Sequence, residues 1–267
     1  MKRCLPWFVF MLGLNAQAED IKVTIHVDDA YKPFSFIEGG EAKGMYIDVL
    51  RTAFSRMEDF DVTMKPVPWE RGKYLMERGD GFGLAPAFFH GHDWPYLYPY
   101  SQPFYTETIQ AVCTEDVLSS PRPDWPDDYK GLTIGNVMGF DGWGGRKFRS
   151  MVADGKIAYE EVKGTHGNIL KLAEDRVDCI MMEQRAFDYT IRSLREAGVY
   201  KDEMEPLKKG AVIGTDPVYI GYSKPAREEG HYPYQLEFMQ AFDSVIYRMR
   251  KTGEIDRIME AYNGGTD

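Results

Sequence analysis

The sequence has no excess of basic residues, and this excludes one large class of partner. It contains 32 Lys and Arg residues against 42 Asp and Glu residues, which gives a formal net charge of −10. Proteins that bind the phosphate backbone of nucleic acids need clustered positive charge. We therefore expect no nucleic-acid partner for this acidic chain.

Residue clusters that bind metals or cofactors are also missing. The sequence has no Cys-x-x-Cys and no His-Glu-x-x-His motif. His90 and His92 are the closest pair of histidines, and their spacing of two suits neither ligation from one helix face nor a zinc knuckle. No nucleophile and base stand in a recognisable catalytic pattern. We expect no metal, no cofactor and no catalytic residue.

Beyond its first residues the sequence has no long apolar run. Residues 1–18 begin with Lys2 and Arg3, continue with an apolar stretch over 5–14 and end on Ala16-Gln17-Ala18. This order is typical of a cleavable signal peptide, whose removal leaves 30 basic residues against 42 acidic ones, a net charge of −12. No later stretch approaches the ~18 apolar residues of a membrane span. We therefore expect an exported, soluble protein.

Cysteine is scarce, with three residues in the chain. Cys4 lies inside the expected signal peptide. Cys113 and Cys179 lie in apolar segments that are typical of strands, and a buried free thiol is the interpretation we favour for each. An oxidising compartment also permits a disulfide between them. The Cα separation that decides between the two states cannot be derived from sequence.

The sequence is rich in alternating strand-like and helix-like segments. Segments typical of strands span residues 21–27, 62–67, 132–137, 178–182 and 218–222. Amphipathic segments predict helices over 45–57, 70–78, 147–153, 167–173, 186–197, 234–251 and 255–262. This alternation predicts an α/β protein with two mostly parallel sheets flanked by helices, in two lobes joined by two crossings. Ligands of such sheets bind beyond the carboxyl ends of the strands, here between the lobes.

Six segments resemble, in the same order, those of a known family. They are Tyr31–Phe36, Gly44–Val49, Tyr100–Tyr105, Gly131–Gly135 followed by Gly139, Arg176–Ile180 and Lys251–Ile258. Together they resemble the periplasmic solute-binding proteins of the polar amino-acid ABC-transporter type, bacterial extracellular solute-binding protein family 3. The resemblance implies the type II periplasmic-binding-protein fold and a location in the periplasm. It places the signal peptide at 1–18, the first lobe at 19–112 and 217–267, and the second lobe at 113–216.

The resemblance also implies which residues face the ligand. Asp28 and Tyr31 fall at the ligand-facing start of the first lobe, and Trp69 falls where the family stacks an aromatic ring on the ligand. Glu183 falls where the family commonly has an Asp that holds the ligand amine. An indole face supplies apolar contact area and attracts a cation. The alternative for Trp69 is a core side chain at the start of its helix.

The positions that grip a ligand carboxylate in the family differ in this chain. The slots for a small residue, a hydroxyl and an Arg read Ala87, Phe89 and Trp94. Trp cannot form the bidentate hydrogen bonds by which an Arg holds a carboxylate. The glycine turn of the second lobe carries Phe140 and Asp141 in place of hydroxyl and small residues. We therefore do not expect an α-amino acid held in the usual way.

Acidic and aromatic side chains dominate the expected site. Asp28, Asp141 and Glu183 favour a cationic or amine-bearing ligand, by ion pairing and by cation–π contact with the aromatic residues. An anionic ligand would need Arg71 or Arg185 turned inward. Alternatively, some of the aromatic side chains pack the lobe interface, and Asp141 caps a helix.

We interpret the chain as a non-catalytic, monomeric binding protein that captures a small polar molecule for an ABC-type membrane permease. Two alternatives stay open. Some relatives on this fold are dehydratases of cyclohexadienyl acids, and Glu183 could serve such an enzyme as general acid if burial raised its pKa. A sensory binding protein that signals to a membrane partner is the other alternative.

Overall fold

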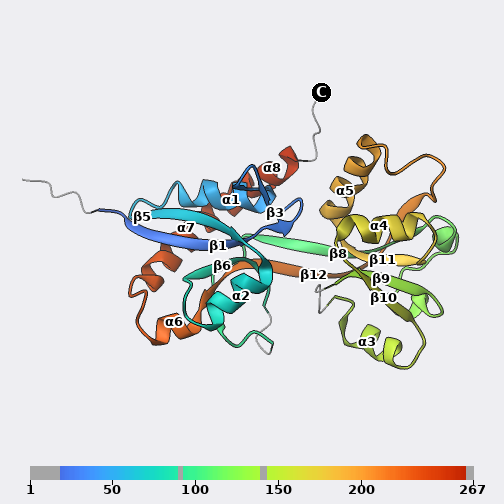
Figure 1. The fold of residues 1–267 in the computed structure, drawn as a ribbon, viewed down its shortest axis with the longest axis horizontal. Coiled ribbons are helices and arrows are strands. Elements are labelled where there is room, and N and C mark those ends of the chain that lie inside the picture. Colours follow the sequence, from blue (N-terminus) through green and yellow to red (C-terminus); the bar gives the residue numbers. More distant parts are fainter. Residues whose placement is uncertain (1–18, 90–92, 139–142, 263–267) are drawn as a thin grey trace, which may run out of the picture.

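The computed structural model describes residues 19–89, 93–138 and 143–262, which form two lobes joined side by side (Figure 1). The expected signal peptide, His90, His92, Phe140 and Asp141 lie outside the described residues. The architecture is α/β with helices flanking the sheets, as the sequence predicts.

The first lobe is built on a sheet in which three neighbouring strands run parallel. Its strands are β1 (Ile21–Asp28), β5 (Phe60–Val67), β6 (Gly83–Ala87) and β7 (Leu97–Tyr100), and β5, β1 and β6 are parallel neighbours. Its helices are α1 (Met45–Phe54), α2 (Trp69–Glu77), α6 (Lys224–Glu228), α7 (Gln235–Lys251) and α8 (Glu254–Ala261). A small antiparallel sheet of β2 (Ala30–Tyr31), β3 (Ser35–Glu38) and β4 (Glu41–Lys43) connects β1 to α1.

The second lobe repeats the parallel arrangement with fewer elements. Its strands β9 (Thr133–Val137), β10 (Ala158–Val162) and β11 (Cys179–Glu183) are parallel, with β9 in the middle. Its helices are α3 (Gly145–Ala153), α4 (Thr165–Ala173) and α5 (Gln184–Glu196).

Two long antiparallel strands join the lobes (Figure 1). β8 (Tyr105–Thr114) runs from the first lobe to the second, and β12 (Leu207–Ser223) runs back. They pair from Leu207 opposite Thr114 to Val218 opposite Tyr105. Beyond Val218, β12 pairs with β6 of the first lobe. Residues 109–113 of β8 also pair, along the other edge of the strand, with β11 of the second lobe. The sheet order is therefore continuous through the junction, β10-β9-β11-β8-β12-β6-β1-β5.

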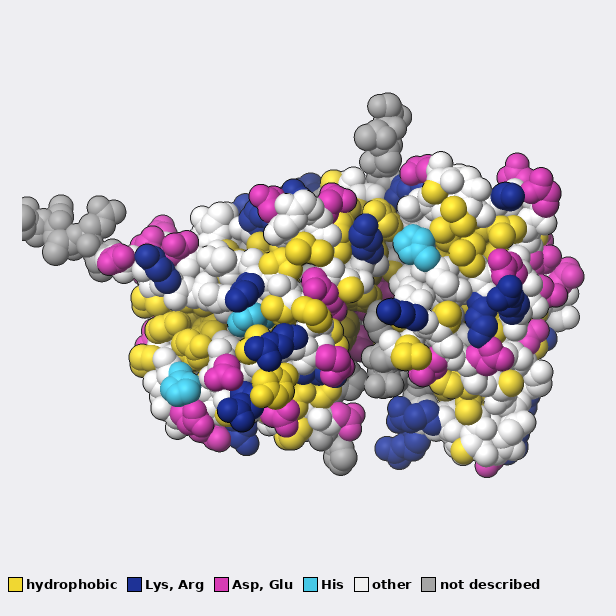
Figure 2. All heavy atoms as spheres, in the orientation of Figure 1, with side chains coloured by type: hydrophobic (Ala, Val, Ile, Leu, Met, Phe, Trp, Pro, Cys, Tyr) yellow, Lys and Arg dark blue, Asp and Glu magenta, His cyan; other side chains and the backbone are white. Residues whose placement is uncertain are grey.

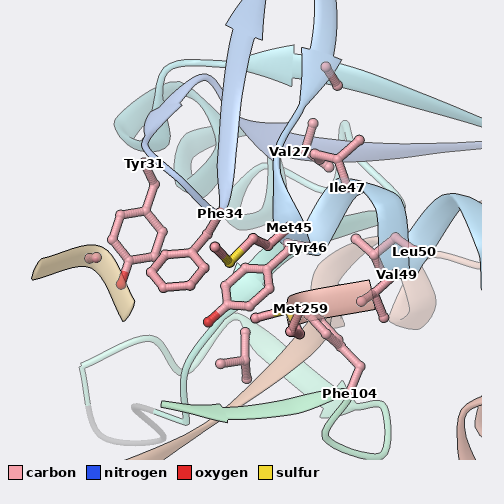
Figure 3. Close-up of a cluster of buried hydrophobic side chains, with 14 of the residues drawn as sticks. Val27, Tyr31, Phe34, Met45, Tyr46, Ile47, Val49, Leu50, Phe104 and Met259 are labelled. Carbon is pink, nitrogen blue, oxygen red and sulfur yellow. The ribbon is translucent and has the colours of Figure 1, made fainter. Parts of the chain in front are cut away.

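The core of the first lobe lies between its sheet and the three helices α1, α7 and α8. The predicted apolar face of α1 is confirmed, because Ile47, Leu50 and Ala53 are fully buried and Phe54 is nearly so. Figure 3 shows this face from Met45 to Leu50, with Met259 of α8 and Phe104 packed against it. Burying such side chains contributes roughly 1.5–3 kcal/mol each to folding.

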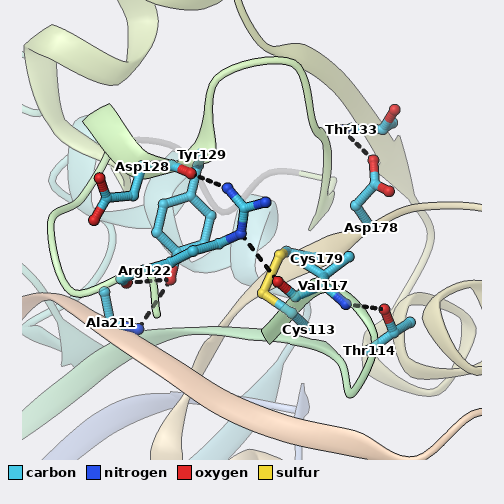
Figure 4. The surroundings of a disulfide bond; sticks show 10 residues. All are labelled: Cys113, Thr114, Val117, Arg122, Asp128, Tyr129, Thr133, Asp178, Cys179 and Ala211. Carbon is cyan, nitrogen blue, oxygen red and sulfur yellow. Dashed lines mark hydrogen bonds between the residues drawn. A yellow bond between two sulfur atoms is a disulfide. The ribbon is translucent and has the colours of Figure 1, made fainter. Parts of the chain in front are cut away.

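The favoured free-thiol state of the two cysteines is wrong, because Cys113 and Cys179 form a disulfide (Figure 4). The two residues lie directly opposite each other on the antiparallel strands β8 and β11, and their Cα atoms are 4.0 Å apart. Sequence spacing did not reveal this register, because the strands are separated by 66 residues. The Tyr129 hydroxyl, which accepts a hydrogen bond from the Ala211 backbone N–H, lies close by (Figure 4).

Some strands differ from the sequence-based expectation in extent and direction. β12 is 17 residues long, whereas only 218–222 were expected. Most residues of its first half are exposed or partly buried, so it lacks the apolar run that marks a buried strand. The outer strands of both lobes are parallel as expected, but the strands at the junction are antiparallel.

Candidate functional site

The carboxyl ends of the parallel strands in both lobes point toward the junction. β6 is antiparallel to β12, so β6, β1 and β5 end toward the second lobe. β11 is antiparallel to β8, so β11, β9 and β10 end toward the first lobe. The space-filling view shows the surface indented between the two lobes (Figure 2). Because ligands of such sheets bind beyond the strand carboxyl ends, the junction is the candidate site.

A fully buried carboxyl group lies at this junction, on Glu107 of β8. The Tyr46 hydroxyl of α1 donates a hydrogen bond of 2.7 Å to its Oε1. The Tyr31 hydroxyl of β2 lies 2.9 Å from Oε1 and 3.0 Å from Oε2. The ring centroids of Tyr31 and Phe34 are 5.0 Å apart and those of Phe34 and Tyr46 4.5 Å apart, so the three rings stand in a row (Figure 3). Two tyrosines of the first lobe thus hold a carboxyl group of the connecting strand.

Glu183 brings a second buried carboxyl group to the junction, from the second lobe. It is the last residue of β11 and the N-cap of α5, where its Oε2 accepts a 2.7 Å hydrogen bond from the Ala186 backbone N–H. An acidic side chain is favourable there, because the first N–H groups of a helix need acceptors. Only 1 % of Glu183 is exposed. A carboxylate has about four lone-pair positions, so the cap leaves Glu183 able to accept further donors.

Burial makes ionisation of these carboxyl groups unfavourable. Loss of solvation raises the pKa of Glu183 to about 7, against the opposing hydrogen bonds of backbone N–H groups. Burial, and then the charge of Glu183, raises the pKa of Glu107 well above its usual range, while the hydroxyls of Tyr46 and Tyr31 oppose that rise. Asp216, opposite Glu107 on β12, adds to it. The junction therefore has a strong demand for positive charge, either protons or a cationic group.

Asp28 is at the carboxyl end of β1, as expected. Its Oδ1 accepts a 2.9 Å hydrogen bond from the Ala30 backbone N–H, and burial raises its pKa to about 6. Its charge also reaches Tyr31, whose pKa is raised by burial, then by Glu107 and Glu183, and then by Asp28. The charges of Asp28, Glu107 and Glu183 thus all act on Tyr31.

Aromatic side chains form a second group on the first lobe. Trp69, at the start of α2, meets Trp94 edge to face with ring centroids 5.7 Å apart. The Lys73 ammonium lies 5.6 Å from the centre of the Trp94 ring and 2.7 Å from Glu70. Trp69 and Trp94 are half-buried and pack with the buried Met76, Leu84 and Leu97. Trp69 and Trp94 thus contact each other, with a cation of the chain itself beside Trp94.

The other expected site residues that the structure describes form no hydrogen bond, ion pair or ring contact with the buried carboxyl groups or with the Trp69–Trp94 pair. Ala87, the last residue of β6, is fully buried opposite Tyr219 of β12. Phe89 is 64 % exposed and its ring meets Tyr100 edge to face. Arg71 is exposed and its guanidinium lies 5.3 Å from the ring centre of Tyr74 on its own helix. Phe140 and Asp141 lie outside the described residues.

Arg185 acts electrostatically on one of the buried carboxyl groups, Glu183. Its Nε donates a 2.8 Å hydrogen bond to the Tyr105 hydroxyl, and its charge lowers the pKa of Glu183. Arg185 is on α5 of the second lobe and Tyr105 is the first residue of β8. The Arg185 side chain, whose positive charge acts on Glu183, is thus turned toward the connecting strand β8.

Sequence reasoning missed Glu107 and Tyr46, although a signal for Glu107 existed. Glu107 has the same parity as Ile109, Ala111 and Cys113, which are buried like the rest of β8 from Ile109 onward. A charged residue on the apolar face of a strand indicates a special role or a buried partner. No comparable signal marks Tyr46, because an apolar helix face accommodates a tyrosine ring without a visible partner.

The described residues contain neither a cluster of metal-ligating side chains nor a membrane-spanning helix. Across 19–89, 93–138 and 143–262, no three His, Cys, Asp or Glu side chains are grouped as a metal site would need. Within the same ranges, no helix has the length and apolar character to span a membrane.

Comparisons with known proteins agree with this architecture. The model of bacterial extracellular solute-binding proteins, family 3, matches residues 23–265. No protein of curated function matches this sequence. An ancestral arginine-binding protein bound to arginine has a similar structure, with a TM-score of 0.64 and 16 % identity, over 91 % of this chain and 98 % of that one.

Two other solved structures represent different uses of the fold. A histidine kinase sensor domain with similarity to periplasmic binding proteins has a TM-score of 0.65 and 15 % identity, over 92 % of this chain and 97 % of the other. An ancestral amino acid-binding protein described as a precursor of cyclohexadienyl dehydratase has a TM-score of 0.61 and 15 % identity, over 90 % and 94 %. At such identities these likenesses establish the fold alone.

Proposed function

Since this chain belongs to the bacterial extracellular solute-binding proteins of family 3, we propose that it captures a small polar, amine-bearing molecule between its two lobes. The observation that carries the proposal is the buried cluster of carboxyl groups at the lobe junction. The second lobe contributes Glu183 to it, the first lobe contributes Asp28, and the strand that joins the lobes contributes Glu107. A ligand ammonium placed there gains charge-assisted hydrogen bonds and removes the cost of burying unpaired charge.

The aromatic residues of the first lobe support a ligand with apolar area beside its amine. Trp69 and Trp94 lie after the carboxyl ends of β5 and β6, on the side of the lobe that faces the junction. Half-buried indole rings offer contact area at small entropic cost. We propose Asp28, Tyr31, Trp69, Trp94 and Glu183 as the ligand-binding residues. The resemblance to the family adds Arg71, Ala87, Phe89, Phe140 and Asp141 as further candidates.

A ligand screen followed by titration of two variants tests this proposal. Amines, amino acids and dicarboxylates are screened for a rise in melting temperature, since a ligand of the folded state stabilises by mass action. The ligand found is then titrated calorimetrically into Glu183→Gln and, as a control that keeps a charge change on the first lobe, Arg71→Gln. Glu183→Gln is expected to lose several kcal/mol of binding, roughly 3–5, and Arg71→Gln to bind normally. The reverse result identifies an anionic ligand gripped by Arg71.

We propose that the ligand is delivered to an ABC-type membrane permease and that the binding protein acts as a periplasmic monomer. Closure of two lobes around a ligand gives a permease a surface that the open form lacks. Mass spectrometry of the protein from the periplasmic fraction is expected to give a chain that starts at Glu19. Co-purification with a kinase or cyclase in place of a permease would establish the sensory alternative.

Glu183 also favours a second candidate function. With its pKa raised to about 7, this carboxyl group is protonated in about half of the molecules at neutral pH and could donate its proton to a leaving group, as a dehydratase of cyclohexadienyl acids requires. Incubation of the protein with such acids tests this. Product formation that Glu183→Gln abolishes would establish the enzyme, and its absence in the wild type excludes it.

A further inference from the structure

A hydrogen bond joins the two lobes away from the strands that connect them. Tyr262 follows α8 of the first lobe, and its backbone carbonyl accepts a 3.0 Å hydrogen bond from the guanidinium of Arg192, on α5 of the second lobe. Tyr189, one turn earlier on α5, also acts electrostatically on the Tyr262 hydroxyl. In Figure 1, α8 and α5 lie on the same side of the connecting strands. One face of α5 is thus turned toward the end of α8.

Tyr262 is tied to the first lobe at its other end. Its hydroxyl donates a hydrogen bond to Asp48 of α1, and Asp48 pairs with Arg51 on the same helix. The guanidinium of Arg56 on α1 forms two hydrogen bonds to the carboxylate of Glu254 on α8, and α8 packs against both α1 and α7. The Tyr262 carbonyl therefore moves with the first lobe.

Arg192 moves with the second lobe. Its helix, α5, packs against α4 and β11. The helix begins after Glu183, which lies opposite Ile109 of the connecting strand β8, and Arg192 follows nine positions later. At a rise of 1.5 Å per residue, Arg192 is about 13.5 Å from that end of the helix, so a rotation of the lobe by about 20° around that end moves it by roughly 5 Å. A hydrogen bond does not survive such a displacement.

We propose that the hydrogen bond between Arg192 and Tyr262 is a latch, which holds the lobes in the arrangement of this structure when no ligand is bound. Its donor is charged, and charge-assisted hydrogen bonds are stronger than those between neutral groups. Loss of the latch is expected to shift the ratio of more open molecules to this arrangement by about tenfold. The use of the latch rests on the proposed function, because it sets how often the site between the lobes is accessible, but its existence depends on no ligand.

The latch and the aromatic pair lie on opposite faces of the first-lobe sheet. Leu84 of β6 packs with Met76 of α2 in the group that contains Trp69 and Trp94, whereas the next residue, Ala85, belongs to the core under α1. The helix α8 packs on α1, on that second face. Variants of the latch therefore leave the aromatic residues of the proposed site in place.

Small-angle X-ray scattering of the ligand-free protein tests the latch. The scattering of the wild type should match this structure. Arg192→Met removes the hydrogen-bond donors but keeps most of the apolar stem, and its radius of gyration is expected to be larger. Arg195→Met is the matched control, because Arg195 is on the same helix and its guanidinium lies 5.1 Å from the ring centre of Tyr200, within the second lobe. It makes the same change in charge and should scatter like the wild type.

Tyr262→Phe tests the other partner and serves as the second variant if Arg192→Met does not fold. It removes the hydroxyl that ties Tyr262 to Asp48 and keeps the carbonyl, so a smaller increase in the radius of gyration is expected. The double variant should be no more open than Arg192→Met, because without Arg192 the tie to Asp48 holds nothing. Melting followed by circular dichroism establishes that each variant is folded.

Three results would overturn the inference. They are a wild type that is already more open than this structure, an Arg192→Met variant that scatters like the wild type, and an Arg195→Met variant that opens as far as Arg192→Met. Because no ligand is added, a ligand screen that finds nothing leaves the scattering result unaffected. Equally, scattering that does not change leaves the ligand screen and its variants unaffected.

Discussion

At the scale of single residues, Gly44 is a position that has no room for a side chain. It precedes α1 with φ at 119°, and a Cβ there would lie 2.5 Å from the carbonyl oxygen of Phe34. That contact is with backbone, so no side-chain movement relieves it. The loop that carries Tyr31 and the helix that carries Tyr46 meet at this point, so the glycine helps to place both hydroxyls.

We expect Gly44→Ala to lower the free energy of unfolding by at least about 2 kcal/mol, because backbone strain and a steric clash add. Gly39→Ala is the matched control, since Gly39 has φ at 61° but no atom within 4 Å of the added Cβ. It should cost about 1 kcal/mol from the left-handed conformation alone. Urea denaturation of both variants measures the difference, and equal losses would show that the contact with Phe34 is relieved.

Glu183 links stability to pH at the same scale. Because its folded-state pKa is raised to about 7, its contribution to stability is complete below the unfolded-state pKa near 4.3 and is lost as the pH rises through 7. We expect the free energy of unfolding to fall by about 2 kcal/mol between pH 5 and 8. In Glu183→Gln, whose amide oxygen can still cap α5, the fall should be smaller. Chemical denaturation across this pH range checks the slope, and identical slopes would contradict the assignment.

The residues of the site could be predicted only in part. Asp28, Tyr31 and Glu183 are placed by short motifs at strand ends, and the charges of Asp28 and Glu183 both act on Tyr31. Glu107 accepts hydrogen bonds from Tyr46, 61 positions away in the sequence, and from Tyr31, 76 positions away. Such a contact depends on how the strands cross, which local periodicity does not encode.

At the scale of elements, helices were easier to predict than strands. Each amphipathic segment forms a helix whose ends lie within a few residues of the expected ones, because burial of one face repeats every turn. The strand β10 was missed because its sequence, AYEEV, is largely exposed at the edge of the sheet. The first half of β12 was missed for a related reason, since it pairs with β8 with little apolar content.

The disulfide joins two of these elements, β8 and β11, across 66 residues. Its loss frees the unfolded chain, and a loop of this length corresponds to about 4 kcal/mol. We expect Cys113→Ala combined with Cys179→Ala to lower the free energy of unfolding by about that amount, in guanidinium denaturation followed by circular dichroism. The reduced wild type should be destabilised similarly. A double variant as stable as the oxidised protein would show that the bridge contributes nothing.

At the scale of the whole molecule, the junction decides where the second lobe can be separated. The strand β8 supplies residues 109–113 to the pairing with β11, so a fragment of residues 113–216 lacks nearly all of that strand. We expect this fragment to be unfolded by circular dichroism. A fragment of residues 105–218 retains β8 and its partners on β11 and β12 and should be folded. Folding of the shorter fragment would place the lobe boundary at 112/113, as the family resemblance implies.

The lobes also meet away from the buried carboxyl groups. Arg192 of α5 donates a 3.0 Å hydrogen bond to the backbone carbonyl of Tyr262, which follows α8. The Tyr262 hydroxyl donates in turn to Asp48 of α1. This contact runs from the second lobe to two helices of the first, so separation of the lobes has to break it or carry it along.

The pairing of β8 with β12 has a mechanical consequence. A ribbon of two hydrogen-bonded strands resists sliding, because sliding breaks the ladder, but it bends more easily across its thin direction. The register shifts between Lys209 and Val212 and between Val212 and Gly214 are irregularities at which such a ribbon gives way first. We therefore expect the proposed opening and closing of the lobes to follow a single bending coordinate. One distance between the lobes is then enough to describe the state of the whole molecule.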